Sequence, residues 1–191
     1  MATQEDELSE LAALLAKNIA DIFREKGVRL SQVPTLERKN ILEYKGRMRA
    51  DGMEKFNSPT FVAAVNYFVS SRDMQKNNAL GAVIVYIEQN YVPTIMKLLK
   101  YPSINEENDD ALCDSAGTLA NIIAGRFKSA VSANGYIELE MSPFMSYRNT
   151  APNGVAFCFK EYDKYQIGVF IFDKKRLVVE LTMGHIPKTK S

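Results

Sequence analysis

Residues 110–131, DALCDSAGTLANIIAGRFKSAV, decide the fold of this chain. The stretch has no proline, and its apolar residues recur at spacings of three and four. It therefore predicts a long amphipathic helix over residues 110–134, closed by Gly135. On a wheel of about 100° per residue, one side faces the core and carries Leu112, Ala116, Leu119, Ile123, Phe127 and Ala130.

The opposite side of this helix, called the strip below, carries small and weakly helix-forming residues in place of the usual lysines and glutamates. Each of its two glycines costs a helix about 1 kcal/mol relative to alanine. In the middle of the strip, the asparagine is the polar group that projects furthest from the helix. We therefore interpret the strip as a surface with few large side chains, which another molecule can approach closely. The strip consists of Asp110, Asp114, Gly117, Thr118, Asn121, Gly125 and Lys128.

Two other interpretations of the strip stay open. In one, another segment of the same chain, such as a helix predicted at residues 5–26, packs against Gly117 and Gly125, and Asn121 is an internal hydrogen-bonding group. In the other, the strip is an ordinary solvated surface, which leaves the cost of the two glycines without a compensating contact. The solvent exposure of Asn121 separates these interpretations.

The rest of the chain reads as an α+β sequence. An amphipathic helix is predicted at residues 5–26, where Gly27 suits its C-terminal cap, and a shorter helix at residues 90–99. Strands are predicted where apolar, β-branched and aromatic residues accumulate. These strands lie at residues 41–49, 61–70, 80–87, 136–141, 155–162, 165–172 and 176–182.

These elements predict a single domain over residues 1–191, because the chain shows no linker composition, low-complexity tract or internal repeat. We expect a mostly antiparallel sheet of about six or seven strands, with the two long helices packed on one of its faces. The strands within residues 136–182 close the sheet, and residues 184–191 are expected to form a loose tail.

Composition excludes several classes of protein. The 191 residues are 46% hydrophobic and 25% charged, with a formal net charge of +1, so neither nucleic acid nor an anionic membrane is expected as the main partner. No run approaches the roughly 20 apolar residues of a membrane-spanning helix. The acidic start MATQEDELSE is unlike a signal peptide. We therefore expect a cytoplasmic protein.

The chain has few of the residues that metal sites and nucleophilic catalysis use. Its only histidine, His185, excludes sites with several histidines and argues against a histidine-based triad. Its two cysteines, Cys113 and Cys158, lie far apart and are expected to be reduced core residues. Neither GxxxxGK[ST] nor GxGxxG occurs. We expect no metal and no cofactor held by this chain.

The segment GTLANIIAGRFKSAV at residues 117–131 resembles the central helix of the CheC/CheX chemotaxis phosphatases. In that family the helix carries Glu-x-x-Asn, followed closely by a small residue and glycine. Asn121 falls on the family's asparagine, and Ala124–Gly125 fall on the pair that follows. One copy of the motif resembles CheX more than CheC, which carries two. Asn18 lacks the flanking motif, and we interpret it as a surface residue.

The resemblance implies a partner and a mechanism. Proteins of this family dephosphorylate the aspartyl phosphate of a response-regulator receiver domain, and the asparagine orients the attacking water. Asn121 is therefore the candidate catalytic residue, since a carboxamide can accept one hydrogen bond and donate another. The receiver supplies the Mg²⁺ ion of this reaction. CheX-like proteins pair through their sheets, so a homodimer is expected as well.

The sequence departs from the family pattern at the acidic position. The family's glutamate, which pairs with a receiver lysine, is replaced by Thr118. Asp114, two turns before Asn121, is a candidate substitute, and we expect either Asp114 or Thr118 itself to take the anchoring role at the catalytic site. Acids also favour the start of a helix without any partner. The alternative function is a CheX-like binding module or dimeric scaffold that holds a receiver without hydrolysis. The candidate partner-binding residues are Gly117, Gly125, Asp110 and Lys128.

Overall fold

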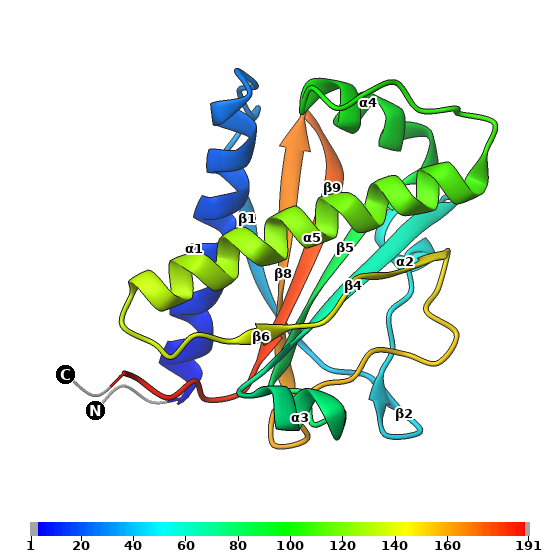
Figure 1. Cartoon of the computed structure of the whole chain (residues 1–191). Coiled ribbons are helices and arrows are strands. Elements are labelled where there is room, and N and C mark those ends of the chain that lie inside the picture. The colour runs from blue at the N-terminus through cyan, green and yellow to red at the C-terminus, as the bar shows by residue number, and fades with distance from the viewer. Residues whose placement is uncertain (1–3, 190–191) are drawn as a thin grey trace.

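A computed structural model describes residues 4–189, with side chains from Glu7 onward, and confirms the predicted α+β class (Figure 1). The helices are α1 (Gln4–Glu25), α2 (Met53–Phe56), α3 (Ser71–Gln75), the 3₁₀ turn η1 (Gln89–Tyr91), α4 (Val92–Leu98) and α5 (Asp109–Ala133). The strands are β1 (Thr35–Asn40), β2 (Glu43–Tyr44), β3 (Arg47–Met48), β4 (Thr60–Phe68), β5 (Gly81–Glu88), β6 (Glu140–Met141), β7 (Met145–Arg148), β8 (Asp163–Ile171) and β9 (Lys174–Met183).

Seven of these strands form one antiparallel sheet in the order β1-β8-β9-β5-β4-β6, and β7 also pairs with β4. β6 and β7 thus follow one another along the same edge of β4. The link between them is tied to that strand: the Ser142 N–H donates to the Asn66 carbonyl, and the Asn66 N–H donates to Ser142 Oγ, both at 2.9 Å. This link carries Phe144 to a position beneath α5.

One face of the sheet is covered by α1 and α5, as predicted (Figure 1). The two helices bury their apolar sides in the same cluster as the sheet residues that point toward them. Both observed helices begin and end within one residue of the predicted bounds, because their apolar periodicity is unbroken. The largest fully buried side chains of this layer include Leu15, Ile19, Phe23, Phe61, Tyr67, Ile87 and Phe127.

The other face of the sheet is covered by residues 41–57 and 149–162, called the cover below. Its apolar side chains bury the alternate residues of the central strands, so that β4 and β5 have almost no exposed side chain. Burial on both faces explains why these strands read as continuous apolar runs. The cluster contains Met48, Ala50, Val62, Ala64, Ala82, Ile84, Tyr86, Ala151, Val155, Phe157 and Val178.

A buried carboxylate ties the cover to the sheet. Glu180 Oε1 lies 2.6 Å from the Lys55 Nζ of α2 and 2.9 Å from the Lys164 Nζ of β8. The Tyr86 hydroxyl donates to Glu180 Oε2 at 2.7 Å. Burial raises the pKa of Glu180, but the charges of Lys164 and Lys55 and their hydrogen bonds outweigh it, and the net pKa is lowered.

The N-terminal strand prediction is wrong in position. Residues 41–49 hold only the two-residue strands β2 and β3, and the edge strand β1 lies at Thr35–Asn40, outside any predicted strand. β1 has the sequence TLERKN and is almost wholly exposed. It therefore lacks the apolar alternation from which a strand is recognised.

Two of the predicted closing strands are also corrected. Residues 155–162 form no strand. A single bridge joins Val155 to Met48, and the buried Val155 and Phe157 pack onto the outer face of the sheet. Within residues 136–141 only β6 is a strand, and β7 has no counterpart in the prediction.

The predicted loose tail is wrong as far as Thr189. Ile186 is fully buried, and the Ile137 N–H donates to the Pro187 carbonyl at 2.9 Å. The Nδ1 atom of His185 lies 2.7 Å from Glu7 Oε2 of α1, although the ring itself stays largely exposed. Residues 190–191 lie outside the described residues.

We predict that Glu180→Gln lowers the free energy of unfolding by about 3–5 kcal/mol at pH 7, because it leaves the buried Lys164 and the partly buried Lys55 without their counter-charge. Urea denaturation measures this change. The exposed Glu54→Gln is the control and is expected to shift stability by less than about 0.5 kcal/mol.

The lowered pKa of Glu180 also determines how its contribution to the free energy of unfolding changes with pH. Because folding lowers the pKa of Glu180, its stabilising contribution is present above the ordinary glutamate pKa and is lost as pH falls toward the folded value. The difference between wild type and Glu180→Gln should therefore narrow on acidification. A difference that is constant or grows as pH falls contradicts this assignment.

Candidate functional site

The strip lies on the outward side of α5, with Asn121 in its middle. Asn121 is exposed, and its side chain forms no hydrogen bond with residues 4–189. Asp110 and Asp114 are exposed too, while Thr118, Gly125 and Lys128 are partly exposed. The interpretation in which Asn121 is an internal hydrogen-bonding group is therefore wrong.

The rotation of α5 is fixed from below by Tyr67 of β4. The buried Tyr67 hydroxyl donates to the Ala124 carbonyl at 2.8 Å, and its ring meets the edge of Phe127 with the ring centroids 5.9 Å apart. Burial raises the pKa of Tyr67 well above its ordinary value, so the hydroxyl keeps the proton that it donates. These contacts hold one side of α5 on the sheet and turn Asn121 outward.

The structure assigns different environments to the two glycines of the strip. A Cβ on Gly117 would lie 2.2 Å from ring atoms of Phe144, whereas one on Gly125 would meet nothing within 4 Å. Gly117 thus serves packing within the chain, against the β6–β7 link and not against α1. The prediction that Gly117 offers a bare surface to a partner is wrong, and the accessible part of the strip centres on Thr118, Asn121 and Gly125.

The charges along the strip differ in how far they are satisfied. Lys128 Nζ lies 3.3 Å from Glu138 Oε1, so its charge already has a partner. Neither Asp110 nor Asp114 has an ion pair within residues 4–189. Asp109, just outside the strip, pairs with Arg148 of β7 at 2.6 Å. Along α5, Asp114 is therefore the unpaired acid closest in sequence to Asn121.

Several neighbours of the strip had no sequence signal. Phe144 closes one flank, but nothing in MSPFMSYR (residues 141–148) marks it as a contact of a helix 27 residues earlier. Beyond the other flank, Arg126 pairs with Glu25 of α1 beside a cavity of about 190 Å³.

The asparagine of α1 is bonded within its own helix. The Nδ2 group of Asn18 donates a hydrogen bond to the Leu14 carbonyl at 2.9 Å.

The strip offers a carboxamide and carboxylates, and nothing in the described part of the chain adds a metal site to them. Within residues 4–189 no three His, Cys, Asp or Glu side chains are grouped so that they could hold a metal ion. Over the same residues, no helix combines the length and the apolar character needed to cross a membrane. Cys113 and Cys158 are free and partly buried.

Solved structures identify the fold. The chain resembles a CheC-like superfamily protein from Shewanella sp. PV-4, with a TM-score of 0.54, 14% identity and coverage of 90% of this chain and 95% of that chain. It also resembles the chemotaxis protein CheX from Desulfovibrio desulfuricans, with a TM-score of 0.52, 12% identity and coverage of 91% and 99%. It resembles FliY from Thermotoga maritima as well, with a TM-score of 0.55, 13% identity and coverage of 96% of this chain and 92% of that chain.

At such identities the likeness shows the fold alone, and the predicted CheX-like fold is confirmed. No protein-family model matches the sequence, and no curated protein matches it. The roles of individual strip residues are therefore argued from their geometry.

We predict opposite effects for the same substitution at the two glycines. Gly125→Ala should stabilise the protein by up to about 1 kcal/mol through helix propensity. Gly117→Ala should be less stable than Gly125→Ala by about 1–3 kcal/mol, because the new methyl group displaces Phe144. Urea denaturation of both variants measures the difference, and equal stabilities would show that Gly117 is not a packing site.

Proposed function

We propose that this chain binds a phosphorylated response-regulator receiver domain through the strip and hydrolyses its aspartyl phosphate. The observation that carries the proposal is the carboxamide of Asn121, which is exposed and lacks a hydrogen-bond partner within residues 4–189. By the sequence resemblance, this residue also falls on the family's asparagine. A solvated helix surface gains nothing from that arrangement, whereas a group that enters a partner's active site requires it.

The chemistry needs only positioning from this chain. An acyl phosphate is already activated, and in phosphoryl transfer most of the catalytic effect comes from orientation and electrostatics. The Asn121 side-chain oxygen would accept a hydrogen bond from the attacking water while its NH₂ group donates one to an oxygen at the reacting centre. Water then attacks phosphorus, the bond to the aspartate oxygen breaks, and the products are phosphate and a free carboxylate. The receiver would supply the Mg²⁺ ion.

The surroundings of Asn121 suit close docking. Gly125, one turn further along α5, has no side chain, and open space lies above it. Asp114 lies seven residues before Asn121, roughly 10 Å along the helix axis, and its free carboxylate can pair with a cation of the receiver. The partner therefore meets an amide near the centre of the contact and an acid toward the helix start.

A second candidate function is receiver binding without hydrolysis. Thr118 supports it, because this residue cannot form the ion pair that the family's glutamate forms. The missing pair is worth about 0.2–1 kcal/mol if exposed and about 2–5 kcal/mol if desolvated. The expected homodimer remains part of both proposals. Since the chain covers both faces of β4 and β5 itself, other surfaces would have to form it.

We predict that Asn121→Ala reduces the acceleration of receiver dephosphorylation by roughly 100-fold, the effect of removing one positioned hydrogen-bonding group. The measurement is the lifetime of phosphate on each receiver domain of the source organism, with and without the protein. Asn90→Ala, at an exposed asparagine of η1, is the matched control and should keep full activity.

The same assay separates the two candidate functions. Saturable binding of a receiver with no change in phosphate lifetime supports the binding module and contradicts hydrolysis. If no receiver binds and none loses phosphate faster, both candidate functions are wrong.

Thr118→Glu should strengthen binding of the receiver by up to about fivefold, the equivalent of one exposed ion pair of about 1 kcal/mol. Thr118→Gln introduces a side chain as long as that of glutamate but without its charge, and it should not reproduce the gain in affinity. The gain should also shrink as salt concentration rises. If Glu and Gln act alike, residue 118 makes no charge-dependent contact with the partner.

A further inference from the structure

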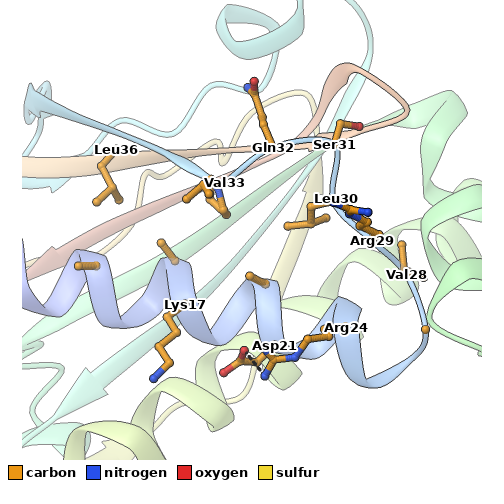
Figure 2. A pocket seen from close by; sticks show the side chains of 15 residues that line it. Lys17, Asp21, Arg24, Val28, Arg29, Leu30, Ser31, Gln32, Val33 and Leu36 are labelled. Carbon is orange, nitrogen blue, oxygen red and sulfur yellow. Dashed lines mark ion pairs between the residues drawn. The ribbon is translucent and has the colours of Figure 1, made fainter.

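A concave surface lies away from the strip, between α1 and residues 27–36. This groove has a volume of about 990 Å³, and none of the residues lining it belongs to the strip. Figure 2 shows the side chains of Leu30, Val33 and Leu36 on one wall, with α1 as the other wall. The α1 wall presents small residues, Ala13, Ala16 and Ala20, at helical spacing.

The apolar wall opposite α1 is left uncovered by residues 4–189. Val33 is 84% exposed and Leu36 is 42% exposed, although each lies beside other apolar side chains of the groove. Such a contiguous apolar surface on a folded protein is typical of an interaction site. The exposure of Val33 leaves this side of the groove open, which favours an extended occupant over a compact small molecule, since a binding pocket buries such a molecule by about 70–90%.

The charges at the groove are unbalanced. Arg24 is paired with Asp21 at 2.7 Å. Lys17 extends from α1 and Arg29 from the opposite wall (Figure 2), and neither forms an ion pair within residues 4–189. The groove therefore combines an apolar floor with two unpaired cations, one on each side. An occupant complementary to it has an apolar stripe flanked by acids.

We propose that this groove is a docking site for an acidic amphipathic helix of a protein partner. The lining of α1 runs from Ala13 to Arg24, roughly 16 Å at the helical rise of 1.5 Å per residue. That length accepts about three turns of a helix with apolar anchors at i, i+3 or i+4, and i+7. Strand addition fits less well, because β1 contributes only Leu36 to the lining.

The test is a selection from a library of random 18-residue peptides displayed on phage, with the full chain as target. Val33→Glu serves as the counter-target, since this exposed substitution leaves the fold intact, as thermal unfolding can verify. The enriched peptides should carry apolar residues at helical spacing with Asp or Glu beside them, and they should bind Val33→Glu at least tenfold more weakly.

Charge reversal then tests the complementarity. Lys17→Glu combined with Arg29→Glu should weaken the selected peptide at least tenfold, and replacing the peptide's acids by lysine should restore its binding to this variant. Lys76→Glu combined with Lys97→Glu makes the same change in net charge at exposed positions outside the groove and should leave the affinity unchanged.

Three results would overturn the proposal. The first is enrichment of peptides that bind wild type and Val33→Glu equally. The second is saturable binding of oleate in the groove with no peptide enriched, which would make it a lipid site. The third is a dimer that Val33→Glu converts to monomer, which would make a second copy of the chain the occupant. None of these results depends on the activity proposed for the strip.

Discussion

The hydrogen bond from the buried Tyr67 hydroxyl to the Ala124 carbonyl determines what the rest of the molecule can present. A tyrosine hydroxyl in the core needs a partner, since leaving it unsatisfied costs about 1–3 kcal/mol. Here the partner is a backbone atom of α5, so this side chain, together with the buried apolar side of the helix, fixes the rotation of a helix of 25 residues. Asn121 points outward because Ala124 and Phe127 are held inward. β4 also carries the β6–β7 link that brings Phe144 against Gly117, so the same strand shapes the flank of the strip.

The elements that the sequence predicts well are those with a regular apolar pattern, either one apolar side of a helix or a continuous apolar run in a strand. α1 and α5 expose one side and bury the other, and β4, β5, β8 and β9 are apolar enough to be recognised wherever they pair. β1 escapes prediction because an exposed edge strand obeys no apolar pattern. Residues 155–162 mislead for the opposite reason: Val155 and Phe157 pack onto a sheet face, and no sequence pattern separates that role from membership of the sheet.

The strip shows the same limit at the scale of single residues. Its exposure around Asn121 follows from the helical wheel, but the burial of Gly117 depends on a phenylalanine that reaches it through the path of another segment. Two glycines of identical propensity, about 80° apart on the wheel, therefore have unrelated reasons to be glycine. The groove beside α1 could not be predicted from the sequence either, because it depends on the path that residues 27–36 take after the end of the helix.

The contact between Glu7 and His185 has a consequence for engineering. It brings the first turns of α1 within hydrogen-bonding distance of the segment that follows the last strand, so the two ends of the described chain are neighbours. A short linker could join them, and new ends could be opened in the polar loop at residues 103–107. Such a circular permutant would keep every strand pairing of the sheet. It would also free both termini for labels at a place chosen by the experimenter.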